Sequence, residues 1–339
     1  GIQEIPVTNV ENACASASTA LDMAATWLEA GRGGVALAVG AEKMFHEDRA
    51  KMFSVFDGGW DVHDVEAATD RLLALGQGVA DPDGEEDTGQ RSVFMDVYAA
   101  LAKFHMKSFG TTQAQLAAVA AKNHAHSAHN PLSQYREAMT VDEVMAGRKV
   151  SWPLTLPMCS PISDGAAAAI ICREEELDRF DRSRSVKIHA TALRTGSDRD
   201  PQEFDRHVTH LAARDAYERA GLGPDDMDVA EVHDATAFAE IQQVENLGFC
   251  DFGAGGALTE SGATSIGGRI PVNPSGGLES KGHPVGATGL AQVFELTTQL
   301  RGEAGGRQVS DAKFAIAENG GGFHGIEEAV ACVTILGRD

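Results

Sequence analysis

Two small-residue turns, one near each end of the chain, carry the residues best suited to covalent chemistry. Cys14 lies in the segment NACASAS (residues 12–18), directly before an apolar run with helical spacing. The unpaired N–H groups and the macrodipole of a helix N-terminus favour the thiolate, the nucleophilic form of cysteine. His283 lies in a second turn of this kind, residues 276–289, and is a candidate base. A cysteine and a histidine presented in this way predict an activated nucleophile that forms a covalent thioester.

The composition is that of an ordinary globular protein with a strongly acidic surface. The chain has 339 residues, of which 43% are hydrophobic and 23% are charged, and this length is comfortable for two domains. The 28 Lys and Arg against 50 Asp and Glu give a formal net charge of −22, which argues against a nucleic-acid-binding protein. An acidic average still permits an anionic substrate where the site is locally positive or rich in backbone N–H donors.

The five cysteines are widely spaced, and none forms a CxxC pair. This spacing favours reduced thiols over a disulfide or zinc framework. We see no signal peptide and no apolar run of membrane-spanning length. The sequence therefore predicts a cytoplasmic protein that binds neither membrane nor nucleic acid.

Two stretches of the chain resemble each other, which predicts a duplicated α/β unit with two related sheets. Each copy contains a turn, a helix, a strand and a later strand. The elements after the turn are residues 19–31, 35–39 and 165–172 in the first copy, and residues 287–301, 313–317 and 329–336 in the second. The second copy also has a strand, helix and strand at residues 186–192, 211–220 and 229–233. Since their equivalents in the first copy would precede Gly1, we expect the chain to lack its first structural elements.

A long insertion separates the two strands of the first copy. The expected division is a first half at residues 1–44 and 158–180, an inserted domain at residues 45–157, and a second half at residues 181–339. Within the insertion, residues 81–90 are acidic and glycine-containing, which predicts an exposed loop. Residues 94–109 and 112–124 have helical apolar spacing, so that the insertion should form a helical subdomain over the site.

The motifs, taken in order, resemble those of the thiolase family over essentially the whole chain. They are the Cys14 turn, the His233-Asp234-Ala235 triplet, the Gly-His-Pro segment around His283, and the glycine-rich residues 318–322. The His-Asp pair is similar to the sterol-carrier-protein-type branch, since other thiolases use Asn-Glu there. The resemblance implies a five-layer α-β-α-β-α fold with an inserted helical loop domain. It also implies coenzyme A as substrate, no metal or redox cofactor, and a homodimer or tetramer.

The resemblance assigns roles to particular residues. Cys14 would be the nucleophile, His283 its base, and His233 a group that stabilises the enolate oxygen. The backbone N–H groups of Cys14 and Gly321 would form a second oxyanion hole. Ser163 and Phe238 are weaker candidates for contacts to the pantetheine arm of the substrate.

A second histidine-rich segment invites a metal interpretation. His124, His126 and His129 precede a proline turn and have no nearby Cys or Glu ligand. We therefore expect surface or loop histidines here and no metal site.

The chain departs from the family pattern at one point. Thiolases generally carry a second cysteine that moves a proton at the α-carbon of the acyl group, but the two matching positions here are Asn319 and Ala235. Neither side chain performs acid–base chemistry. Glu318, Asp234 and His324 are possible substitutes.

The leading hypothesis is a thiolase-type acyltransferase of lipid metabolism that moves an acyl group between a 3-oxoacyl-CoA and coenzyme A. One alternative is a thiolase-like retro-aldolase or lyase acting on steroid side-chain CoA esters, whose relatives work with an acyl-CoA-binding partner protein. The other is a non-catalytic acyl-CoA-binding subunit.

Overall fold

The computed structural model describes residues 3–82, 84 and 92–338. The helices are α1 (Ser16–Glu29), α2 (Arg49–Ser54), α3 (Val65–Ala74), α4 (Val93–Phe109), α5 (Gln113–Ser127), α6 (Val141–Met145), α7 (Val208–Ala220), α8 (Ala237–Asn246), α9 (Gly255–Glu260), α10 (Gly277–Lys281) and α11 (Thr288–Leu300). The strands are β1 (Val35–Glu42), β2 (Lys149–Ser151), β3 (Leu154–Thr155), β4 (Gly165–Cys172), β5 (Lys187–Thr195), β6 (Val229–Glu231), β7 (Phe314–His324) and β8 (Glu327–Gly337). The acidic loop expected over residues 81–90 falls largely outside the described residues.

Two sheets organise the fold. The larger has the strand order β5-β8-β7-β6, in which β5, β8 and β7 are antiparallel and β6 runs parallel to β7. The smaller pairs β1 with β4 along their whole lengths, from Val35 opposite Cys172 to Glu42 opposite Gly165. Strands β2 and β3 form a separate short hairpin.

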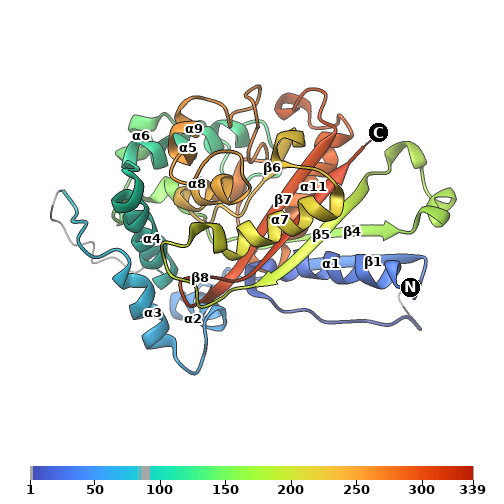
Figure 1. Cartoon of the computed structure of the whole chain (residues 1–339), viewed down its shortest axis with the longest axis horizontal. Helices are drawn as coiled ribbons and strands as arrows, with labels where there is room; N and C mark the ends of the chain where they lie inside the picture. Colours follow the sequence, from blue (N-terminus) through green and yellow to red (C-terminus); the bar gives the residue numbers. More distant parts are fainter. Residues whose placement is uncertain (1–2, 83, 85–91, 339) are drawn as a thin grey trace.

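Helices α1 and α11 lie between the two sheets. Leu21 of α1 and Leu290 of α11 share one buried cluster with Ala38 of β1 and Ala315 of β7. Helix α7 covers the opposite face of the larger sheet, as Figure 1 shows. This order of layers, α-β-α-β, confirms the expected α/β class. In the described part of the chain the outer face of the smaller sheet carries exposed apolar side chains, including Leu37 at 50% and Ile170 at 65%.

The duplication expected from the sequence is confirmed. In the first copy the 3₁₀ turn η1 (Ala13–Ala15) leads into α1 and β1, and β4 pairs antiparallel with β1. In the second copy the 3₁₀ turn η8 (Val285–Ala287) leads into α11 and β7, and β8 pairs antiparallel with β7. The helices that follow the two turns pack closely at their first residues: a Cβ atom placed on Gly289 of α11 would lie 2.6 Å from the backbone nitrogen of Ser18 in α1.

The segment between β1 and β4 is mostly helical and gathers at one end of the molecule (Figure 1). Gly110 ends α4 in a left-handed conformation with φ 81°, and Thr112 begins α5 through a capping box with Gln115. Helices α4 and α5 pack on α8 of the second half through a shared cluster that includes Leu101, Leu116 and Ile241. The domain boundaries proposed from the sequence remain predictions.

Three expectations need correction. Strand β7 does not end before the glycine-rich segment but continues through it to His324, because β8 pairs with it there. Strand β6 stops at Glu231, since side chains rather than a neighbouring strand accept the next two backbone N–H groups. His124 and His126 are buried in α5 and bonded to backbone, with the Nδ1 of His126 lying 3.0 Å from the carbonyl oxygen of Asn273. They are core histidines rather than surface ones.

None of the helices in the described ranges combines the length and the apolar character needed to cross a membrane.

Candidate active site

Cys14 is the central residue of the turn η1, and side chains of α1 hold that turn in place. The backbone N–H of Asn12 donates to the hydroxyl of Ser16 over 2.9 Å, and the Asn12 side chain donates to Thr19 over 3.0 Å. Ala13 takes a positive φ of 49°, which L-residues adopt rarely and at some cost. The nucleophile is thus held on a constrained turn at the start of a helix.

His283 meets Cys14 from the second copy. Its Nε2 lies 3.3 Å from the Cys14 sulfur, and its Nδ1 lies 2.7 Å from the Thr288 hydroxyl oxygen. The Thr288 hydroxyl donates its proton to the carbonyl oxygen of Pro284 over 3.0 Å, so it receives the Nδ1–H of the histidine. This network assigns to His283 the tautomer that carries its proton on Nδ1. The lone pair of Nε2 therefore faces the thiol.

The surroundings favour the neutral form of both members of this pair. Close packing raises the pKa of the Cys14 thiol to about 12, although its own backbone N–H and that of Gly322 point to the sulfur and favour the thiolate. Burial, with further contributions from His233 and Lys281, lowers the pKa of His283 well below its usual value. The sequence led us to expect a Cys14 thiolate stabilised by the helix N-terminus. Burial overrides this expectation, because it disfavours the charged form of the thiol, as it does the charged form of the histidine.

His233 follows β6 and lies beside His283, with the two ring centroids 5.1 Å apart. Its backbone N–H donates to Glu318 over 2.9 Å, which fixes the main chain. The side chain is only 2% exposed, and neither ring nitrogen has a hydrogen-bond partner among the described residues. Burial lowers the pKa of His233 to about 4. A neutral, unpartnered imidazole is available to donate one N–H to a substrate oxygen.

Strand β7 approaches the nucleophile so closely that only glycine fits. A Cβ atom on Gly321 would lie 2.3 Å from the carbonyl oxygen of Asn12 and 2.7 Å from the backbone nitrogen of Ala15. The N–H that points to the Cys14 sulfur belongs to the next residue, Gly322, whose φ is 62°. The sequence placed Gly321 in the oxyanion hole, and the glycine run could have indicated the segment. Only the strand register decides which N–H faces the sulfur, so the role of Gly321 remains a prediction.

Asp234 holds the loop that carries His283. One of its carboxylate oxygens accepts the backbone N–H of Leu278 over 2.7 Å, and the other accepts the side-chain amide of Asn123 over 3.1 Å. A Cβ atom on Gly277 would lie 2.0 Å from the same carboxylate. Burial and the neighbouring Glu240 raise the pKa of Asp234 well above its usual value. Asp234 is therefore placed as a positioning residue.

Helix α5 contributes positioning residues that the sequence did not reveal. Lys122 forms a buried ion pair with Glu240 over 2.9 Å. Asn123 donates to both Glu240 and Asp234. The helical apolar pattern predicts the helix but gives no signal for these polar partners, because they come from α8 and from the loop after β6.

The other possible acid–base substitutes lie in different surroundings. Glu318 is fully buried, and burial together with Glu328 raises its pKa to about 8. His324 is exposed at the end of β7. Asn319 accepts a hydrogen bond from Ser18 over 2.9 Å, and Ala235 lies in the hydrophobic core. None of these four residues has a contact to Cys14 among the interactions of the described residues, and none supplies a second thiol.

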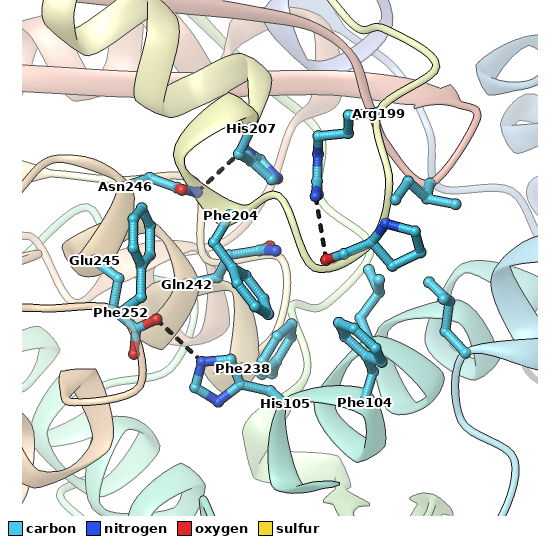
Figure 2. Close-up of a pocket in the computed structure, with 14 residues that line it drawn as sticks. Phe104, His105, Arg199, Phe204, His207, Phe238, Gln242, Glu245, Asn246 and Phe252 are labelled. Carbon is cyan, nitrogen blue, oxygen red and sulfur yellow. Dashed lines mark hydrogen bonds and ion pairs between the residues drawn. The ribbon is translucent and has the colours of Figure 1, made fainter. Parts of the chain in front are cut away.

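Ser163 and Phe238, the expected contacts to the pantetheine arm, are both buried. The Ser163 hydroxyl accepts the backbone N–H of His283 over 3.0 Å and donates to Gln134 over 2.6 Å, so it supports the histidine loop. Phe238 is 1% exposed, and it lines the pocket of Figure 2 with His105 and other residues. The lining of that pocket includes none of the residues at the Cys14 sulfur. Substrate contacts by Ser163 and Phe238 remain predictions.

The chain is similar to known proteins over most of its length. The family model described as thiolase, N-terminal domain, matches residues 1–147, and the one described as thiolase C-terminal domain-like matches residues 191–338. An acetyl-CoA acetyltransferase of Methanothermobacter thermautotrophicus is 41% identical over 100% of this chain and 82% of its own length. Sterol carrier protein 2 of Rattus norvegicus is 39% identical over 94% of this chain, which spans 57% of that relative. A solved structure named Ltp2-ChsH2(DUF35) aldolase has a TM-score of 0.73 at 20% identity and covers 97% of this chain and 78% of its own; at this identity the likeness concerns the fold.

Proposed function

The chain belongs to the thiolase family, and on that premise we propose that it moves an acyl group between a 3-oxoacyl-CoA and coenzyme A through a thioester on Cys14. The observation that carries the proposal is the 3.3 Å contact between Nε2 of His283 and the Cys14 sulfur. The identity of 41% with an acetyl-CoA acetyltransferase supports the same reaction class. Coenzyme A acts as a substrate, and the proposal requires no metal or redox cofactor.

The acylation half-reaction follows from the Cys14–His283 pair. The sulfur of Cys14 attacks the thioester carbonyl of the acyl-CoA while its proton moves to Nε2 of His283. Backbone N–H groups at the sulfur, from Cys14 and Gly322, are suited to stabilise the oxyanion. The carbon–sulfur bond to coenzyme A then breaks, and the leaving thiolate takes the proton from His283. Coenzyme A departs before the second substrate reacts, so we expect ping-pong kinetics.

The carbon–carbon half-reaction needs a stabilised enolate and a proton transfer at the α-carbon. The unpartnered ring of His233 is suited to donate to the enolate oxygen. Of the three substitutes for the second cysteine, we retain Glu318 for the proton, because it accepts the backbone N–H of His233 and has a pKa near neutrality. Glu318→Gln should leave acylation of Cys14 intact and abolish condensation of two acetyl-CoA molecules. Equal loss of both half-reactions would remove this assignment.

A second candidate function follows from the missing second thiol at Ala235 and Asn319. A thiolase-like retro-aldolase or lyase acting on CoA esters of steroid side chains would not need that thiol. In that case we propose an acyl-CoA-binding partner protein. Release of an aldehyde or ketone without consumption of free coenzyme A would favour the lyase. A homo-oligomer and a cytoplasmic location are also proposals.

Intact-mass measurement tests the central proposal. Incubation with acetyl-CoA or acetoacetyl-CoA should add one acyl group to the wild-type chain and none to Cys14→Ala. Cys172→Ser is the matched control, because it removes a partly buried thiol of β4 and leaves the site unchanged. An adduct that persists in Cys14→Ala would overturn the mechanism. Tight binding of acyl-CoA without any adduct would favour a non-catalytic binding subunit.

A further inference from the structure

Cys14, His233 and His283 form a group that is suited to ligation as well as to reaction. The Cys14 sulfur and one nitrogen from each imidazole all lie within 4.8 Å of one another. Ligand lengths of about 2.0–2.3 Å around a tetrahedral zinc ion separate neighbouring donor atoms by roughly 3.4–3.6 Å. The Cys14–His283 distance of 3.3 Å is close to this spacing. The His233 nitrogen, which lies within 4.8 Å of both other atoms, would supply the third ligand.

The unpartnered ring of His233 is an independent sign that this group takes a ligand. Both of its nitrogens are buried and have no hydrogen-bond partner in the described part of the chain. A buried polar atom without a partner costs about 1–3 kcal/mol, so such atoms usually mark a place that something else occupies. One nitrogen of His233 lies within 4.8 Å of the Cys14 sulfur and of a His283 nitrogen, so this unsatisfied group belongs to the same site.

The hydrogen bonds behind His283 also suit a metal ligand. Histidines that bind metals generally use their second nitrogen to donate to an oxygen, which fixes the ring and its tautomer. In His283 the Nδ1–H meets the Thr288 hydroxyl over 2.7 Å, and the free Nε2 faces the sulfur. One thiolate and two imidazoles are a donor set that zinc binds well, with a fourth position open to water.

We propose that the resting site binds one Zn²⁺ ion through the Cys14 sulfur and one nitrogen each of His233 and His283, and that the ion reversibly blocks acylation. The zinc–sulfur bond replaces the S–H bond, the proton leaves to solvent, and no oxidation state changes. Since the ion occupies the nucleophile and its base together, the site either binds metal or reacts with acyl-CoA. The existence of the site is independent of the reaction, whereas its inhibitory effect rests on the proposed function.

Cobalt serves as the probe of the ligand set, because Co²⁺ accepts the same ligands as zinc and a cobalt–thiolate bond absorbs in the near ultraviolet. Titration of the metal-free protein should give one such band per chain, and added Zn²⁺ should remove it. Cys14→Ser should abolish the band, and His233→Asn should weaken cobalt binding at least about tenfold. Cys172→Ser and His63→Asn, which remove a thiol and an exposed histidine elsewhere, should bind as the wild type does.

Two outcomes would overturn the inference: a wild-type chain without the band, or a band that persists in Cys14→Ser. Thermal unfolding of His233→Asn distinguishes loss of a ligand from loss of the fold, and Cys14→Ser provides a second variant with a smaller structural change.

Acylation of the metal-free chain by acetyl-CoA separates this inference from the proposed function. Acylation without a cobalt band would contradict the proposed metal site but not the proposed function. A Cys14-dependent band without acylation would contradict the proposed function but support the metal site. Where both occur, Zn²⁺ should suppress acylation and a chelator should restore it.

Discussion

The hydroxyl of Thr288 lies 2.7 Å from Nδ1 of His283 and determines which histidine nitrogen faces the nucleophile. Its own proton is committed to the carbonyl oxygen of Pro284, so it acts only as an acceptor toward the ring. Thr288 is the first residue of α11, which ties the orientation of the base to the start of that helix. A buried hydroxyl thus holds the base ready to accept the thiol proton.

Thr288→Val should slow acylation of Cys14 by about 10- to 100-fold, because the ring loses its fixed tautomer and orientation. The KM for acyl-CoA should change little, since the Thr288 side chain is buried. Thr288→Ser keeps the hydroxyl and should restore most of the rate. Single-turnover kinetics with acetyl-CoA measure the effect. Equal loss in the valine and serine variants would assign the defect to packing instead.

Alkylation of Cys14 by iodoacetamide should be slow at neutral pH in the metal-free protein. The pKa of the thiol is raised to about 12 by its surroundings, so the reactive thiolate is a minor form. The rate should rise about tenfold per pH unit between pH 6 and 9, with no plateau. A free cysteine levels off as the pH passes about 8.5, and Cys14→Ser supplies the background rate of the other thiols. If the alkylation rate of Cys14 levels off below pH 8, the resting pair is a thiolate and an imidazolium, which would contradict the neutral thiol and imidazole expected here.

Gly321→Ala should destabilise the protein by on the order of 1–3 kcal/mol and impair acylation. The added methyl group would meet backbone atoms of Asn12 and Ala15. Backbone atoms cannot rotate aside as the end of a flexible side chain can. Gly58→Ala is the matched control, since a Cβ atom there has no neighbour within 4 Å. Urea unfolding and adduct formation report the two effects. A Gly321→Ala variant as stable and as active as Gly58→Ala would show that β7 need not lie so close to the Cys14 turn.

Acid should destabilise the fold in part through His233. The pKa of this ring is about 4 in the folded chain because of burial, against about 6.5 in an unfolded chain. The unfolded state therefore binds a proton first as the pH falls, so stability is complete above about pH 6.5 and decreases toward pH 4. The full loss is about 3 kcal/mol. His233→Asn should reduce the pH dependence of the unfolding free energy over this range by that amount. The exposed His63→Asn should leave it unchanged.

The local signals in the sequence were sufficient for much of the architecture. Gly110 and Thr112 mark the boundary between α4 and α5 because a left-handed residue ends one helix and a capping hydroxyl begins the next. The strand over Gly165–Cys172 has the bounds expected, since an apolar run of that length between turn residues has few alternatives. These features depend on near neighbours in the chain, which the sequence displays directly.

Other features depended on partners far away in the sequence. Strand β7 extends through a glycine-rich segment only because β8 pairs with it, and His124 is buried only because other elements cover α5. Asp234 has the residue type of a catalytic acid. Its contacts to Leu278 and Asn123, which are 44 and 111 positions distant, make it a support for the histidine loop.

By itself, the sequence determined the family, through the resemblance of its motifs. It also determined the α/β class and the two turns that present Cys14 and His283, which follow from residue types, spacing and local backbone preferences. Tertiary structure alone decided the distance of 3.3 Å between the sulfur and the imidazole, the tautomer, the neutral state of both groups, and the N–H that faces the sulfur. The physical reason is that hydrogen-bond geometry and desolvation depend on every atom packed around a group, and those atoms come from segments that the chain brings together only when it folds.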